Sequence, residues 1–233
     1  MAMAKAMPST KAPSKVQRLK KARRALAQYQ AKRSFDQTPE PSGGKAPAKD
    51  ALRFCVQKHA ASHLHYDFRL EVDGVLKSWA VPKGPSLQAG LRRLAMQVED
   101  HPYDYRTFEG SIPKGQYGGG TVMLWDEGTY TLPGVEGRAE TEAVMRRGLA
   151  KGHLSIELHG SKLEGGFALL RLPPKGEGSR AKASWLLVKK ADAHASRNDV
   201  LAQDLSVSSG RSMEGIAQGL KKSLEARRRR PRP

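Results

Sequence analysis

The stretch HYDFRLEVDGVLKSWAV, residues 65–81, decides the fold class of this 233-residue chain. Apolar and polar residues alternate along its first half with a period of two, which is typical of a strand with one face on a core. The Asp-Gly pair in VDGV is a hairpin turn signal, so we expect residues 63–72 and 75–81 to pair as antiparallel strands. The apolar face of the first strand consists of Leu64, Tyr66, Phe68 and Leu70.

Short β runs continue on both sides of this hairpin, from about residue 51 to residue 190. They are separated by Gly and Pro, and their sequences are RFCVQKH, RLAMQVE, GTVMLWDEGTYTL, GHLSIELHG, GGFALLRL and SWLLVKK. One stretch with a helical pattern, residues 139–152, interrupts the strands. Many short strands with few helices indicate a mainly β domain, either a closed or nearly closed β-barrel or a sandwich.

The positive charge of the chain is concentrated in its flanks. The formal net charge is +18, of which residues 1–50 carry +9, residues 51–190 carry +5 and residues 191–233 carry +4. Basic arms on an ordinary folded domain are typical of proteins that hold a polyanion. Nucleic acid is the first candidate and an anionic membrane surface is the second. We expect residues 15–33 to form a basic helix.

Cysteine content and hydropathy indicate the compartment. Cys55 is the single cysteine, which excludes a disulfide framework within the chain and favours a reducing compartment. No apolar run approaches the roughly 18–20 residues of a membrane span. The N-terminus lacks the apolar region of a secretory signal. We therefore expect a cytosolic protein of bacterial type.

The polar face of the first strand carries an unusual set of side chains: His63, His65, Asp67, Arg69 and Glu71. His65 and Asp67 point into the same space, and His59, at the end of the preceding strand, completes a set of three. Two imidazoles and a carboxylate suit a divalent ion such as Mn²⁺, Fe²⁺ or Zn²⁺ and leave positions open for substrate and water. Arg69 adds the bidentate fork that binds phosphate oxygens. The alternative is a polar strand face with incidental histidines.

Three long motifs occur along the chain in this order: FCVQKHAASHLHYDFRLEVDGVLKSWAVPKGPS, RLAMQVEDHPYDYRTFEGSIPKGQYGGGTVMLWDEGTY and SWLLVKK. Together they closely resemble the 3′-phosphoesterase domain of bacterial DNA ligase D, a domain that also has stand-alone relatives. The resemblance implies a compact β-barrel with one or two short helices and basic flexible tails. It divides the chain into a basic tail and helix (1–32), the phosphoesterase domain (33–190) and a basic C-terminal extension (191–233).

The resemblance also implies the residues of the site. The implied metal ligands are His59, His65 and Asp67. The implied phosphate-contacting and catalytic groups are Arg69, His101 and Tyr105. Supporting roles in substrate binding fall on Gln57, Lys83 and Arg93, and the flanking motif RSFDQTPEP adds Arg33 and Glu40. Ser34 stands where relatives often have Asp.

The activity that the resemblance implies is Mn²⁺-dependent trimming of 3′ ends at a primer–template junction. The enzyme removes a terminal ribonucleoside to leave a 3′-phosphate, and then removes that phosphate to leave the 3′-OH that a ligase needs. The implied partners are DNA or DNA/RNA primer–template ends, a DNA ligase and end-binding repair proteins, with no membrane. The implied location is the bacterial cytoplasm, in association with the nucleoid.

Two other functions fit parts of the same sequence. Two histidines and a carboxylate are also the pattern of non-haem Fe(II) oxygenases, which would take the second histidine from His153 or His159 and make His59 dispensable. A catalytically inactive DNA-end-binding subunit that recruits a ligase would fit the basic tails equally well.

Overall fold

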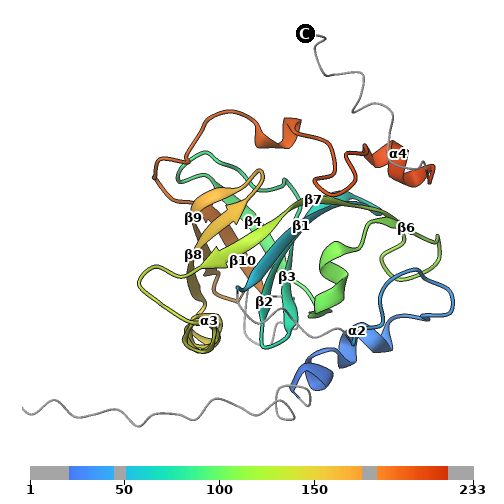
Figure 1. The fold of residues 1–233 in the computed structure, drawn as a ribbon, viewed down its shortest axis with the longest axis horizontal. Helices are drawn as coiled ribbons and strands as arrows, with labels where there is room; N and C mark the ends of the chain where they lie inside the picture. The colour runs from blue at the N-terminus through green and yellow to red at the C-terminus, as the bar shows by residue number, and fades with distance from the viewer. Residues whose placement is uncertain (1–20, 45–50, 175–182, 220–233) are drawn as a thin grey trace, which may run out of the picture.

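Antiparallel strands close into a β-barrel in the computed structural model, which describes residues 21–44, 51–174 and 183–219 (Figure 1). Pairing runs from β1 through β2, β3, β4, β10, β9 and β8 to β7, and β7 returns to pair with β1. The strands of this circuit are β1 (Arg53–Ala60), β2 (Leu64–Val72), β3 (Val75–Val81), β4 (Arg92–Gln97), β7 (Gly120–Thr131), β8 (His153–Gly160), β9 (Glu164–Arg171) and β10 (Ser184–Lys189). The expected mainly β barrel is confirmed.

The expected hairpin is formed by β2 and β3. Val72 pairs with Val75 and Arg69 with Ser78, as antiparallel counting from the turn requires. Asp73 (φ 54°) and Gly74 (φ 83°) both have left-handed backbone conformations. Two positive φ values are the signature of a type I′ turn, whose twist matches that of the flanking strands. The turn therefore sets the register that brings polar side chains of the two strands together.

The barrel interior is filled by the apolar face of β2 and by aromatic residues of β3, β7 and β10. The Tyr66 ring meets Trp125 edge-on at 5.4 Å, and Trp79 meets Trp185 in the same way at 5.8 Å. Leu64 is the exception to the predicted apolar face, because it is 52% exposed. It is the first residue of β2 and lies at the end of the barrel, beyond the core.

The opposite face of β2 is also buried, although the alternation suggested a solvated surface. Asp67, Arg69 and Glu71 are at most 6% exposed. Over Asp67 and Arg69 this outer face is covered by the N-terminal segment with α2 (Ala27–Ala31) and by the short helix η1 (Tyr103–Thr107), next to β5 (His101–Pro102). Glu71 pairs instead with Arg138. The cover forms a second apolar cluster, made of Leu26, Tyr29, Val75, Leu76, Tyr103 and Tyr105.

The two ends of the barrel are closed by different segments (Figure 1). Helix α3 (Arg138–Lys151), expected at 139–152, covers one end and inserts Met145 into the core. The C-terminal segment with η2 (Val200–Ala202) covers the other end, where the Trp125 indole donates to the Gln203 carbonyl at 2.9 Å. Beyond it, α4 (Met213–Ala217) packs beside β7 and β6 (Gly110–Ile112).

Folded structure therefore extends beyond residues 33–190. Tyr29 is fully buried on the N-terminal side, and Val200 and Ile216 belong to the core on the C-terminal side. Of the expected N-terminal tail and helix (1–32) and C-terminal extension (191–233), residues 1–20 and 220–233 lie outside the described residues. Within the described ranges, no helix has the length and apolar character needed to cross a membrane.

Removal of the Phe68 ring tests the assignment of the core face. Phe68 is fully buried and its ring lies 6.4 Å from Trp79, so we expect Phe68→Ala to lower the free energy of unfolding by about 3–5 kcal/mol. Leu94→Ala is the matched control, because Leu94 on β4 is 43% exposed and its truncation should cost about 0.5 kcal/mol or less. Urea denaturation measures both values. Equal losses would contradict the assignment.

Candidate active site

Three candidate metal ligands converge at one end of β1 and β2. His59 and His65 are directly paired across the two strands, and Asp67 follows two residues later on the same face. The three ligand atoms lie within 4.8 Å of one another. The Asp67 Oδ2 atom is 3.5 Å from His59 Nδ1 and 3.7 Å from His65 Nε2. Ligands about 2.1 Å from a tetrahedral ion are separated by about 3.4 Å, so this spacing suits a shared ion.

The tautomers of both histidines fit a metal ion. The other ring nitrogens, His59 Nε2 and His65 Nδ1, each lie 2.9 Å from a backbone carbonyl, that of Gly118 and that of His63. A carbonyl oxygen only accepts, so these nitrogens carry the proton and donate. The remaining ring nitrogens, His59 Nδ1 and His65 Nε2, consequently face Asp67. A backbone partner on the other ring nitrogen is how proteins orient metal-ligating histidines. The donor set therefore fits a divalent cation.

The glycine-rich loop between β6 and β7 holds His59 in this orientation. Gly118, which accepts from His59, has φ +77°, a left-handed conformation that favours glycine. A Cβ atom at Gly120 would lie 2.2 Å from the Ala60 carbonyl oxygen. The glycines thus allow the loop backbone to approach the end of β1 and to reach the ligand.

Arg69 lies behind the ligands and fixes Asp67. Its Nη2 atom donates to Asp67 Oδ2 at 3.1 Å, its Nε to Gln57 Oε1 at 2.8 Å and its Nη1 to Ser78 Oγ at 2.8 Å. Gln57 in turn donates to the carbonyls of Tyr105 and Phe108. Burial raises the pKa of the Asp67 carboxyl, but the Arg69 guanidinium together with His59 and His65 outweighs burial, and this pKa lies well below its usual range. Asp67 is therefore ionised and oriented.

His101 is buried and electrically neutral. Its Nδ1 donates to the Glu99 carbonyl at 2.9 Å, which leaves the lone pair of Nε2 facing the Arg33 guanidinium at 3.5 Å. Burial, followed by the positive charges of Arg69 and Arg33, lowers the pKa of His101 well below its usual value. The Ser78 hydroxyl lies 3.3 Å from His101 Nδ1 and thereby connects His101 to Arg69.

Arg33 and Glu40 form a buried ion pair on the N-terminal segment. Arg33 Nε donates to Glu40 Oε1 at 2.9 Å, and the two side chains are 4% and 0% exposed. The Tyr105 hydroxyl donates to the same carboxylate at 3.0 Å, and the Thr38 hydroxyl donates to its other oxygen at 2.9 Å. Glu40 thus ties the N-terminal segment to η1 above the outer face of β2.

Comparison with known proteins identifies the family of this chain. The model of the DNA ligase D 3′-phosphoesterase domain matches residues 57–171, which include the three candidate ligands. The chain belongs to the DNA ligase D 3′-phosphoesterase family through these residues.

Two curated relatives illustrate the similarity. The chain is 54% identical over 184 residues, 76% of its length, to the multifunctional non-homologous end joining protein LigD of Pseudomonas aeruginosa. It is 42% identical over 147 residues, 63% of its length, to the multifunctional non-homologous end joining DNA repair protein LigD of Mycobacterium tuberculosis. The matches cover 20% and 18% of those proteins, so the chain spans about a fifth of their length.

The phosphoesterase fold joins nine of the eleven expected site residues into one connected set: Arg33, Glu40, Gln57, His59, His65, Asp67, Arg69, His101 and Tyr105. Lys83 is exposed in the turn after β3, and Arg93 lies on β4 with its Nε buried. Within the part of the chain that the structure describes, no hydrogen bond or ion pair links Lys83 or Arg93 to this set. The substrate contacts expected of Lys83 and Arg93 therefore remain predictions.

Four further residues contact the candidate site but were not predicted from the sequence: Ser78, Glu99, Lys32 and Tyr117. Ser78 could have been predicted, because counting outward from the Asp-Gly turn along both strands places Ser78 opposite Arg69. Glu99, Lys32 and Tyr117 meet only in the folded protein, where Lys32 Nζ donates to Glu99 Oε2 and to the Tyr117 hydroxyl, both at 3.1 Å. No local pattern relates residues so far apart in the chain.

The histidines that an oxygenase site would need lie elsewhere. His159 is paired with the Thr131 hydroxyl at 3.0 Å, and His153 begins β8 at the barrel end that α3 covers. The candidate ligand group contains His59 instead. The geometry therefore disfavours the oxygenase pattern.

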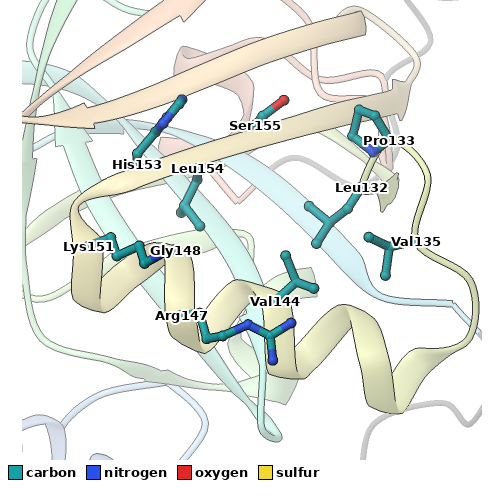
Figure 2. Close-up of a pocket in the computed structure, with 10 residues that line it drawn as sticks. All are labelled: Leu132, Pro133, Val135, Val144, Arg147, Gly148, Lys151, His153, Leu154 and Ser155. Atoms are coloured by element: carbon teal, nitrogen blue, oxygen red, sulfur yellow. The ribbon is translucent and has the colours of Figure 1, made fainter. Parts of the chain in front are cut away.

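A separate pocket of about 320 Å³ lies between α3 and β8 (Figure 2). It is lined by Leu132, Pro133, Val135, Val144, Arg147, Gly148, Lys151, His153, Leu154 and Ser155. His59 pairs with Val122 near the start of β7, whereas Leu132 follows the last residue of that strand. The pocket and the candidate ligands are therefore at opposite ends of the barrel, and the pocket is not part of this site.

Arg69→Met tests the dependence of Asp67 on its buried cation. The change leaves a buried carboxylate without its pair, so we expect a loss of about 3–5 kcal/mol in the free energy of unfolding. Arg147→Met is the matched control, because its ion pair with Glu140 is about 60% exposed on both sides and should contribute about 1 kcal/mol or less. Denaturant unfolding at neutral pH measures both losses. If Arg69→Met lowers the free energy of unfolding as little as Arg147→Met does, Asp67 does not depend on Arg69.

Proposed function

We propose that this protein is a Mn²⁺-dependent phosphoesterase that processes the 3′ ends of DNA strands. It removes a terminal ribonucleoside to leave a 3′-phosphate, and removes the phosphate to leave a 3′-OH. The observation that carries the proposal is the convergence of two imidazoles and one ionised carboxylate, from His59, His65 and Asp67, within a phosphoesterase-family domain.

The residues of the chain have distinct roles in this proposal. His59, His65 and Asp67 would hold the Mn²⁺, which would supply polarisation of a phosphoryl oxygen and stabilisation of the charge that develops on it. Asp67 stays ionised through Arg69, and the backbone carbonyls of Gly118 and His63 keep the two imidazoles aimed at the same point. Preorganised donors of this kind need no rearrangement during the reaction.

The phosphate group is held, in this proposal, by cations at the edge of the ligand group. Arg33 is the candidate nearest to His101, and its position is fixed by Glu40 and by the backbone carbonyl of Tyr29. His101 is neutral, so it offers a lone pair or an N–H rather than a second positive charge. Arg69 contributes indirectly in the described conformation, because its donors are directed to Asp67, Gln57 and Ser78.

The substrate class follows from charge and from the relatives. A net charge of +18 favours a polyanion, and sequence-independent phosphate contacts suit an enzyme that must accept ends of any sequence. The relatives named above are non-homologous end joining proteins, so we propose end-joining repair in the bacterial cytoplasm as the context. A DNA ligase would consume the 3′-OH product, and end-binding repair proteins would present the substrate.

The activity is tested with a 3′-phosphate primer–template and a ligand variant. We expect the wild type to convert the end to 3′-OH with Mn²⁺ and not with EDTA. His65→Ala should lower the rate about a hundredfold or more, because metal stabilisation amounts to several kcal/mol. The fold should be preserved, since His65 belongs to neither apolar cluster of the protein. Gel electrophoresis of end-labelled primer measures conversion.

His153→Ala is the control for this experiment, because His153 is a strand histidine at the opposite end of the barrel. It should retain the wild-type rate. A wild type that binds the ends but never converts them would favour the non-catalytic end-binding alternative. Full activity of His65→Ala would contradict the ligand assignment.

Deletion of residues 1–20 and 220–233 tests the basic arms. The deletion removes 12 Lys and Arg residues with one Glu, and it keeps the docked residues Leu26 and Tyr29. We expect weaker DNA binding and a flatter salt dependence, whose log–log slope falls by about 0.9 for each phosphate that the arms neutralise in the full chain. Turnover at saturating DNA should match that of the full chain. Normal binding with slow turnover would show instead that the arms belong to the active site.

A further inference from the structure

Tyr117 is exposed, whereas the other tyrosines of the chain are buried. Its exposed fraction is 42%, and the remaining five, which are Tyr29, Tyr66, Tyr103, Tyr105 and Tyr130, are at most 8% exposed. It lies on the loop between β6 and β7, beside the N-terminal segment (Figure 1). The ring belongs to neither apolar cluster. Burial in the core therefore does not explain an aromatic side chain here.

Cations and a fixed hydroxyl hold the Tyr117 ring in place. Lys32 Nζ lies 4.6 Å from the ring centroid and the Arg33 guanidinium carbon lies 5.3 Å from it. The Tyr117 hydroxyl accepts from Lys32 Nζ at 3.1 Å and lies 3.5 Å from Glu99 Oε2. A ring that is already ordered loses little conformational entropy when a ligand stacks on it.

The loop that carries the ring is fixed on both sides. Gln116 donates to the Gln37 side chain at 2.8 Å, and Gly119 donates to the Gln116 carbonyl at 3.0 Å. Gly118, the residue directly after Tyr117, accepts from the candidate ligand His59. The exposed ring is therefore one residue away from the contact that orients a metal ligand, at the edge where Arg33 approaches His101.

We propose that the exposed part of the Tyr117 ring is the stacking platform for the base of the terminal nucleotide at a 3′ end. The proposal rests on the proposed function, because a nucleotide whose 3′-phosphate is held at His59, His65 and Asp67 carries its base within reach of this ring. Stacking on an aromatic ring accepts every base, since every base has a π-face. The ring thus gives the site a preference for ends that carry a base over abasic ends, without a preference for sequence.

The experiment compares two primer–templates that differ only in the terminal nucleotide, which carries a 3′-phosphate and either a base or a tetrahydrofuran abasic residue. The variants are Tyr117→Ala, Tyr117→Phe and Tyr117→Trp in the full chain. We expect Tyr117→Ala to raise KM about ten- to hundredfold on the base-bearing end, with a much smaller effect on kcat. Tyr117→Phe and Tyr117→Trp should stay close to the wild type, because both keep a stacking ring.

The abasic end provides the decisive comparison. On the abasic end, the wild type should have a KM as high as that of Tyr117→Ala. Tyr117→Ala should therefore show no loss relative to the wild type on that end. Leu94→Ala is the control, because Leu94 is 43% exposed on β4 and its truncation should leave both ends unaffected. An equal loss for Tyr117→Ala on both ends, or a loss in Tyr117→Phe as large as in Tyr117→Ala, would overturn the stacking role.

Failure of the stacking proposal is distinguishable from failure of the proposed function. If the wild type releases phosphate from both ends equally well, the proposed function stands and the stacking role of Tyr117 is wrong. Equilibrium binding of the two ends, measured by fluorescence anisotropy without metal, tests stacking even if no phosphate is released. A wild type that binds both ends equally would overturn the platform, and tighter binding of the base-bearing end that Tyr117→Ala abolishes would support it.

Discussion

The buried ion pair between Arg69 and Asp67 is the constraint on which the rest of the site depends. Removing both charges from water is costly, and the cost is offset only when further hydrogen bonds satisfy the guanidinium and the carboxylate. Gln57 and Ser78 accept hydrogen bonds from the Arg69 guanidinium, at 2.8 Å each, and they come from the two neighbouring strands. The hairpin register and the pairing of β1 with β2 are therefore requirements of the ion pair as well as of the barrel core. Asp67 in turn reaches the candidate metal position already ionised.

Burial of this pair requires a second layer outside the barrel. Strand β2 directs Tyr66, Phe68 and Leu70 to the core, so its other face would meet solvent in a bare barrel. The N-terminal segment and η1 cover that face, and they are joined through the bond from the Tyr105 hydroxyl to Glu40. The cover also brings Arg33 to His101, whose imidazole is kept neutral by burial and by the two nearby arginines. A single layer of structure thus excludes water from the ion pair and adds a cation to the site.

Backbone atoms, rather than side chains, orient the candidate ligands. His59 and His65 each donate to a main-chain carbonyl, and the carbonyl that serves His59 belongs to the glycine-rich loop. The glycines of that loop are explained by the close approach of its backbone to the end of β1, where a side chain at Gly120 would collide with Ala60. The same loop carries Tyr117, so the backbone contact that orients His59 and the proposed stacking ring lie on one short segment.

The sequence by itself determined the hairpin, the mainly β class and the shared face of His65, Asp67 and Arg69, because these follow from local rules. The pattern left a barrel or a sandwich open, and the choice of a barrel came from the family resemblance. A period of two reports which way each side chain points, and an Asp-Gly turn sets the register, so Asp67 and Arg69 were placed on one face and Ser78 was within reach of the same count. The pattern does not report what covers a face, which is why burial of Asp67, Arg69 and Glu71 was not foreseen. The tertiary structure alone decided that Arg33 would meet His101 and that Lys32 would meet Tyr117. These residues are 68 and 85 positions apart, and such contacts depend on the packing of whole segments rather than on any short stretch of sequence.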